Sequence, residues 1–164
     1  MKPFVVIATI LLTIAIIGIA MVAFKESKGQ AAITTYTLSD QEKPLVRVVK
    51  NSVDFGDMNV SDEKTAEFIL ENIGNKPLEL YGVTSSCGCT FGEIEINKIK
   101  SPRFAMHAKS DWSGVIQQGN TATVKVTYIP SIMPVKGDVT RMVYVKTNDP
   151  KNQELTFSVK ANVK

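Results

Sequence analysis

The only two cysteines of the chain are Cys87 and Cys89, with Gly88 between them. In an extended strand, residues i and i+2 point to one face with Cα atoms about 6.6 Å apart, and their sulfurs do not meet in good disulfide geometry. Gly88 permits a turn or bulge that would bring the thiols together. The pair could then close a strained, reducible disulfide or offer two ligands to one ion.

A metal site would need further ligands, and Met106 and His107 follow in the same part of the chain. Thiolate and thioether donors suit Cu(I), whereas two cysteines with one histidine and another donor suit Zn²⁺. The candidate metal ligands are therefore Cys87, Cys89, Met106 and His107, with copper or zinc as the ion. No cofactor is required if the cysteines are not ligands.

Two other interpretations of the cysteine pair stay open. A dithiol could exchange with disulfides of other proteins, although thioredoxin-like chemistry uses C-x-x-C at a helix N-terminus. A structural pair would simply end a strand, since cysteine is among the most buried residue types. Nucleophilic catalysis is not indicated, because His107 is the single histidine and no nucleophile elbow accompanies the cysteines. We predict that the protein is not an enzyme.

The charge distribution excludes one class of partner. The sequence has 19 Lys and Arg against 16 Asp and Glu, a net charge of +3. The basic residues are scattered, with no basic stripe interleaved with stacking aromatics, as a nucleic-acid-binding surface would have. We therefore predict no nucleic acid partner.

Residues 4–24 form an uncharged, almost wholly apolar run of 21 residues. At about 1.5 Å per residue, a helix of this length crosses a hydrocarbon layer of about 30 Å. Residues 1–24 are thus predicted to be an N-terminal signal anchor, a single transmembrane helix. A removed signal peptide is the alternative, with a shorter apolar region and a cleavage site resembling residues 18–20. The following domain is expected outside the cytoplasm, in the periplasm or at the cell surface.

The remainder divides into a polar stalk, residues 25–43, and a domain, residues 44–164. Alternation of apolar and polar residues predicts strands at residues 65–72, 124–128, 139–147 and 155–163, with further short candidates elsewhere. Alternation fails at residues 91–114, which are predicted to be an insertion loop. About seven strands without a helical pattern predict an all-β fold, an immunoglobulin-like antiparallel β-sandwich.

Several short segments of the domain resemble one bacterial family. They are Asp54-Phe55-Gly56, residues 68–72, residues 74–78, Ser85-Ser86-Cys87-Gly88-Cys89-Thr90 and Thr147-Asn148-Asp149-Pro150. In this order they are similar to the bacterial domain-of-unknown-function family 1573. The resemblance implies an exported, often tethered sandwich like PapD or major sperm protein. It implies no catalytic residues.

The main functional hypothesis is a membrane-tethered, extracytoplasmic immunoglobulin-like module that works by binding. Residues 4–24 would contact the membrane, and exposed sheet edges would bind a protein partner in the cell envelope. The first alternative is a copper- or zinc-binding protein that uses the cysteines with Met106 and His107. The second is a dithiol redox protein.

Overall fold

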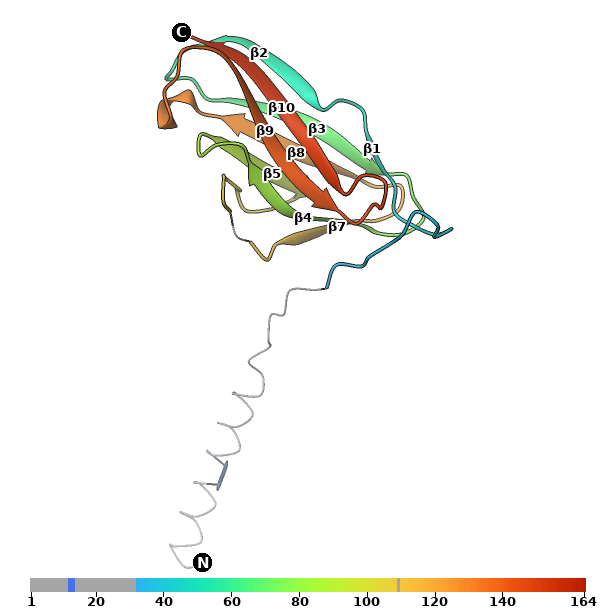
Figure 1. Cartoon of the computed structure of the whole chain (residues 1–164). Helices are drawn as coiled ribbons and strands as arrows, with labels where there is room; N and C mark the ends of the chain where they lie inside the picture. The colour runs from blue at the N-terminus through green and yellow to red at the C-terminus, as the bar shows by residue number, and fades with distance from the viewer. Residues whose placement is uncertain (1–11, 14–31, 109) are drawn as a thin grey trace, which may run out of the picture. The chain divides into compact units, whose positions relative to one another are not determined.

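The computed structural model describes residues 12–13, 32–108 and 110–164 of the chain. Residues 31–164 form one compact unit (Figure 1). Its strands are β1 (Val46–Val48), β2 (Ser52–Met58), β3 (Lys64–Asn72), β4 (Leu78–Ser85), β5 (Thr90–Ile96), β6 (Ile99–Lys100), β7 (Ser113–Ile116), β8 (Thr121–Tyr128), β9 (Gly137–Thr147) and β10 (Glu154–Val163), with a 3-10 helix η1 (Pro130–Ile132).

The predicted transmembrane helix falls almost wholly outside the described residues, which include only Leu12 and Thr13 of the N-terminal run. Within the described residues, no helix has the length and apolar character needed to span a bilayer.

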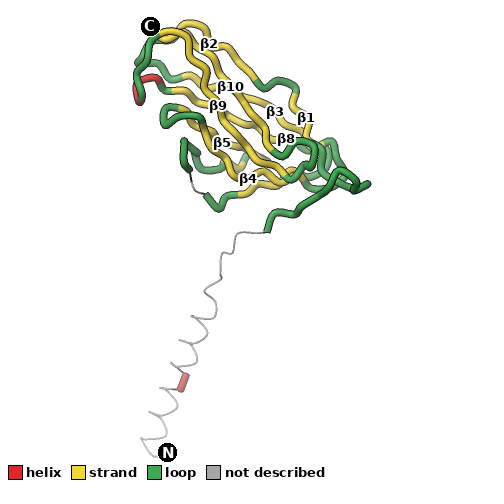
Figure 2. Tube along the Cα trace, in the orientation of Figure 1, coloured by secondary structure: helices red, strands yellow, loops and turns green. Residues whose placement is uncertain are grey.

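The strands form two five-stranded sheets, in the orders β1-β3-β8-β5-β6 and β2-β10-β9-β4-β7 (Figure 2). The prediction of an all-β, immunoglobulin-like sandwich of two sheets is confirmed. The expected number of about seven strands is too low, because the described residues form ten. The strands without a predicted counterpart are β5, β6 and β7. Strands β6 and β7 span only two and four residues, too few to display a period of two.

The prediction of a purely antiparallel sandwich is wrong at one pair of strands. Strand β2 runs parallel to β10, with Ser52 beside Ser158. The chain passes from β1 in one sheet to β2 in the other through residues 49–51, without an intervening strand. Because no turn reverses the chain between them, β2 keeps the direction of β1. Strand β10 runs in that same direction, so β2 and β10 pair in parallel.

The core is built by strands that alternate as predicted. On β3 and β10 the buried apolar residues are Ala66, Phe68, Leu70, Phe157, Val159, Ala161 and Val163. The rings of Phe68 and Phe157, one from each sheet, lie 5.2 Å apart between centroids. Burial of these two aromatic side chains joins the layers.

The predicted insertion loop at residues 91–114 is wrong in its first part, which forms β5 and β6. Strand β5 does alternate, and it buries Thr90, Gly92 and Ile94. The alternation of apolar and polar residues is not visible in the sequence, because Gly92 has no side chain to mark a buried position. A Cβ there would lie 2.7 Å from Val143 Cγ1 in the opposite sheet, so the close approach requires glycine.

The predicted stalk, residues 25–43, is wrong in its second half, because the sandwich holds residues 34–43. The backbone N–H of Thr34 donates to both carboxylate oxygens of Glu79 at 3.3 Å. Near residue 43, Lys76 pairs with Glu42 at 2.6 Å, and its hydrogen bond lowers the pKa of the Glu42 carboxyl. These contacts join distant segments, and local composition carries no sign of them.

Candidate functional site

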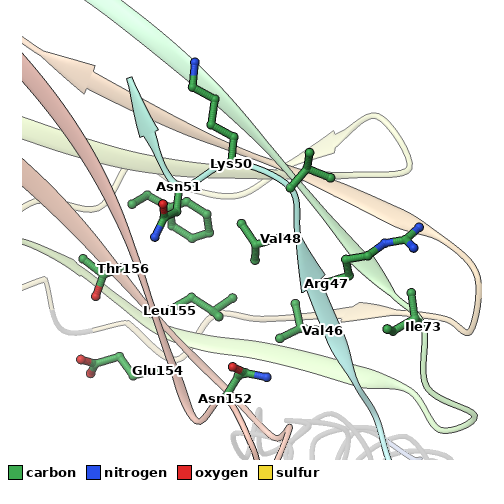
Figure 3. A pocket seen from close by; sticks show the side chains of 12 residues that line it. Val46, Arg47, Val48, Lys50, Asn51, Ile73, Asn152, Glu154, Leu155 and Thr156 are labelled. Carbon is green, nitrogen blue, oxygen red and sulfur yellow. The ribbon is translucent and has the colours of Figure 1, made fainter. Parts of the chain in front are cut away.

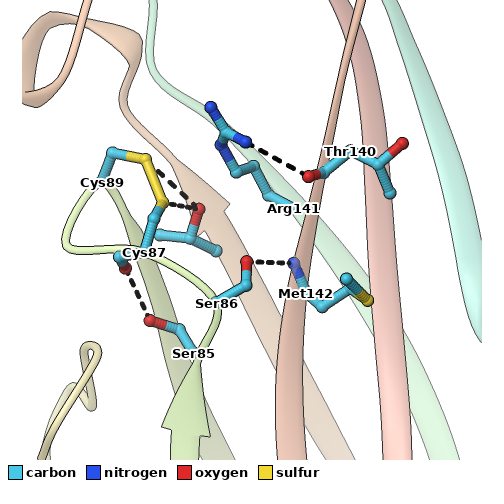
Figure 4. Close-up of a disulfide and its surroundings, with 8 residues drawn as sticks. Ser85, Ser86, Cys87, Cys89, Thr140, Arg141 and Met142 are labelled. Carbon is cyan, nitrogen blue, oxygen red and sulfur yellow. Dashed lines mark hydrogen bonds between the residues drawn. A yellow bond between two sulfur atoms is a disulfide. The ribbon is translucent and has the colours of Figure 1, made fainter.

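The turn between β4 and β5 holds both cysteines, which form a disulfide with Cα atoms 5.3 Å apart (Figure 4). The backbone leaves the extended conformation after Ser85, and this turn brings the sulfurs together. Gly88 is not required for it: its φ is not positive, and a Cβ there would meet only Met133 Sδ, at 3.9 Å. The expected role of Gly88 in enabling the turn is therefore wrong.

Serine side chains anchor this turn to the rest of the fold. The Ser85 hydroxyl donates to the carbonyl oxygen of Cys87 at 2.7 Å. Ser86 N–H donates to the carbonyl oxygen of Met142 at 2.9 Å, and Met142 N–H donates to Ser86 Oγ at 2.9 Å. The two serines of the Ser-Ser-Cys-Gly-Cys-Thr segment thus hold the disulfide against β9.

The disulfide is buried unequally. Cys87 is 8% exposed and Cys89 is 0% exposed, and Thr90 beside them is also fully buried. Thr90 Oγ1 lies 3.2 Å from Cys87 Sγ and 3.9 Å from Cys89 Sγ. A disulfide sulfur has no proton to donate, so the Thr90 hydroxyl is the donor to Cys87.

Two buried polar groups near the disulfide have no hydrogen-bond partner within the described part of the chain. They are the hydroxyl of Tyr128 and Nε of Arg141. The guanidinium carbon of Arg141 lies 5.5 Å from the centroid of the Tyr128 ring, and Tyr128 is the cross-strand neighbour of Thr90. An unpartnered buried donor is costly, so these groups single out this end of the sandwich.

The register of β4 and β9 places Arg141 next to the cysteines. Ser85 is paired with Val143, and the Ser86 hydrogen bonds to Met142 extend that pairing by one residue. Arg141 is the next residue along β9 and shares the inward face of Val143, so it lies near the turn that holds the cysteines. Figure 4 shows the Arg141 side chain on the same side of β9 as the disulfide.

The other two predicted metal ligands, Met106 and His107, lie at the surface. Met106 is 39% exposed, and His107 is exposed in a turn closed by the Ala108 N–H and the Ala105 carbonyl. His107 has a φ of 63°, which orients it as a turn residue. No group of three or more His, Cys, Asp or Glu suited to a metal ion occurs among residues 12–13, 32–108 and 110–164. Sulfurs joined in a disulfide are not thiolate ligands. Copper or zinc binding by the reduced protein stays a prediction.

A second candidate site is a groove where the chain crosses between the sheets. It has a volume of about 590 Å³ and lies between β1 and the first half of β10. Figure 3 shows the side chains of Val46, Val48 and Leu155 between these two strands. Phe157 also lines the groove, and Arg47, Lys50 and Glu154 contribute charges around it. Sequence reasoning missed this groove, because it forms between β1 and β10, two strands of different sheets whose proximity no local pattern indicates.

The disulfide contributes little to stability, because it closes a very short loop. A cross-link between residues two apart lowers the conformational entropy of the unfolded chain, which stabilises the folded state by about 1.6 kcal/mol. This is less than the stabilisation of about 2–4 kcal/mol that a typical disulfide gives. We expect reduction to lower the free energy of unfolding by about 1–2 kcal/mol. Urea unfolding of the oxidised and reduced chain measures this. A Cys87→Ala, Cys89→Ala chain should show no effect of reductant, and a loss above about 4 kcal/mol would contradict the estimate.

The fold and the crossover strand define the class: the chain is an immunoglobulin-like β-sandwich module. Residues 44–162 match the HYDIN/CFA65/VesB-like, Ig-like domain family, and the chain belongs to this family. The immunoglobulin-like part of the expected resemblance is thus confirmed, while membership of family 1573 stays a prediction. No curated protein matches the chain.

Several solved structures are similar to the chain at low sequence identity. A protein of unknown function from Porphyromonas gingivalis W83 is similar with a TM-score of 0.55 and 16% identity, over 74% of this chain and 47% of that one. The chain therefore matches less than half of that protein. The ASH/PapD-like domain 7 of human CEP192 follows, with a TM-score of 0.47, 16% identity and coverage of 80% and 98%. The YadV chaperone has a TM-score of 0.46, 18% identity and coverage of 72% and 51%.

Proposed function

We propose that the protein is a membrane-tethered interaction module that binds an extended segment of a protein partner in the cell envelope. Tethering through residues 4–24, a location outside the cytoplasm and the absence of enzymatic activity belong to this proposal and depend on the sequence. Family 1573, expected from the sequence, would imply the same kind of tethered module. The observation that carries the binding role is the incomplete pairing of β10.

Strand β10 has an open backbone edge over its first four residues. It is paired with β9 from Glu154 onward, but its ladder with β2 begins only at Ser158. Ser158 N–H donates to the carbonyl oxygen of Asn51 at 2.8 Å, toward β2. Because backbone directions repeat every two residues, the N–H groups of Thr156 and Glu154 point to the same side, where no strand of the described residues is hydrogen-bonded to them.

This open edge lies along the groove, so a bound peptide would find both backbone and side-chain partners. When a peptide binds by adding a strand to a sheet edge, its main-chain hydrogen bonds provide affinity. Pockets that accept every second side chain of the peptide provide selectivity. The half-buried Val46, Val48 and Leu155 supply apolar walls. A volume of about 590 Å³ also falls within the range of about 300–1,000 Å³ found for ligand pockets.

The other sheet edges offer less room for a new strand. Strands β6 and β7 are only two and four residues long. On β2, the Lys64 ammonium donates to the carbonyl oxygens of Phe55 at 2.9 Å and Asp57 at 3.0 Å. A lysine that covers edge carbonyls is a device that prevents strand addition. The groove beside β10 is therefore the favoured edge.

The test uses a displayed library of extended peptides selected on the full-length chain. We expect Val48→Lys, which places a charge in the groove, to weaken binding of the selected peptides by at least about tenfold. The matched control is Val115→Lys on β7, where the valine is 43% exposed, and it should leave binding unchanged. Hydrogen exchange should show protection of the Thr156 amide when peptide is bound. Binding that survives Val48→Lys, or that leaves Thr156 unprotected, would refute the proposed site.

A further inference from the structure

We infer that the Cys87–Cys89 disulfide is a thiol–disulfide exchange site for a partner protein that carries a pair of thiols, with Arg141 and Thr90 stabilising the thiolates that form. This inference depends on residues separate from the groove beside β10. Three features carry it: unequal exposure of the two cysteines, a nearby cation that forms no ion pair and an exposed apolar border.

Access determines which sulfur reacts. Only Cys87 has exposed surface, at 8%, whereas Cys89 is fully buried. A partner thiolate therefore attacks Cys87 Sγ, a partner–Cys87 disulfide forms, the Cys87–Cys89 bond breaks, and Cys89 leaves as a thiolate. The second partner thiolate then attacks the partner's own sulfur and releases Cys87. Two electrons pass to the cysteine pair, the partner becomes a disulfide, and its two thiol protons end on Cys87 and Cys89.

Each step creates a negative charge at this site, where the structure holds a cation without an anion. Among the described residues, Arg141 forms no ion pair, and its buried Nε lacks a hydrogen-bond partner. A guanidinium beside a cysteine favours the thiolate over the thiol. The Thr90 hydroxyl, 3.2 Å from Cys87 Sγ, adds a hydrogen-bond donor to the same sulfur. Arg141 Nη1 donates to the carbonyl oxygen of Thr140 at 3.3 Å, so Nε is the group left free to respond to a thiolate formed during exchange.

A surface for the partner lies directly beside the turn. Ile132, Met133 and Val135 are 49%, 48% and 39% exposed in the segment that connects β8 to β9. Met133 Sδ approaches Gly88, the residue between the two cysteines. Neighbouring exposed apolar side chains of this kind suit protein contact. The attacking protein would cover them while its thiolate reaches Cys87.

The experiment follows thiol chemistry on the full-length chain. The oxidised chain is treated with dithiothreitol without denaturant and then with a maleimide, and the added mass counts free thiols. Single-cysteine chains are exposed to oxidised glutathione, and formation of the mixed disulfide is timed. We expect full reduction of the wild type, with Cys89→Ser reacting at least about tenfold faster than Cys87→Ser, because Cys89 is buried.

The role of Arg141 is tested in the Cys89→Ser chain. Arg141→Gln should slow the reaction of Cys87 about tenfold, and Arg141→Lys, which keeps the charge, should restore most of the rate. The control is Arg103→Gln, because Arg103 also lies over an aromatic ring, that of Phe91 at 4.6 Å, and should change nothing. Circular dichroism verifies that each variant is folded. A disulfide that resists dithiothreitol in the folded chain, equal rates for the two cysteines, or no effect of Arg141→Gln would each overturn the inference.

Discussion

Replacing Phe157 with alanine is expected to lower the free energy of unfolding by about 3–5 kcal/mol. Phe157 is fully buried on β10, and its ring lies 5.2 Å from that of Phe68 on the facing sheet. Truncation removes the buried apolar area and leaves a cavity that two sheets, each held by its backbone ladder, cannot close. Urea unfolding followed by circular dichroism measures the loss. A loss of this size is a large fraction of the stability of a single domain.

Two further variants define the result that would contradict this prediction. Ile99→Ala removes an apolar side chain that is 75% exposed, and it should change stability by less than about 0.5 kcal/mol. The double variant Phe68→Ala, Phe157→Ala should show a coupling of about 0.5–1.5 kcal/mol or more, since the rings touch. A Phe157→Ala chain as stable as Ile99→Ala would mean that the sheets do not pack through this pair.

Replacing Asp149 with alanine is expected to cost about 2–4 kcal/mol, the second largest effect. The carboxylate is fully buried and accepts three hydrogen bonds: from Val46 N–H at 2.9 Å, Lys151 N–H at 2.8 Å and Asn152 Nδ2 at 2.9 Å. Alanine leaves these donors without their partner, and unsatisfied buried donors carry most of the cost. Because Val46 begins β1, its amide should also lose protection in hydrogen exchange.

The matched variants for Asp149 separate hydrogen bonding from charge. Asp149→Asn keeps the shape and one acceptor oxygen, so its loss should be smaller than that of alanine. Asp57→Ala removes an aspartate whose side chain is 62% exposed, and it should stay within about 0.5 kcal/mol of the wild type. Equal stability of Asp149→Ala and Asp57→Ala would show that the buried carboxylate does not hold β1.

The predicted segments that proved correct are those whose signal is local. Phe68 on β3 and Phe157 on β10 repeat every second residue with polar neighbours, because each strand has one face in the core and one in solvent. The segment Thr147-Asn148-Asp149-Pro150 was noted for its family resemblance, although its contact with Val46 could not be predicted from it. Strand β5 was not predicted, because Gly92 interrupts its alternation of apolar and polar residues. The reason for a glycine at this position is the close approach of Val143 in the other sheet.

The sequence alone determined the fold class and the position of the cysteine pair, since a period of two and residue identity are properties of a single segment. The tertiary structure decided what surrounds the pair. Arg141 lies near the cysteine turn because Ser86 is hydrogen-bonded to Met142 on β9, and the open edge of β10 exists because β2 joins it only at Ser158. Both depend on pairing between segments far apart in the chain, which closure of the sandwich selects and local propensity does not encode.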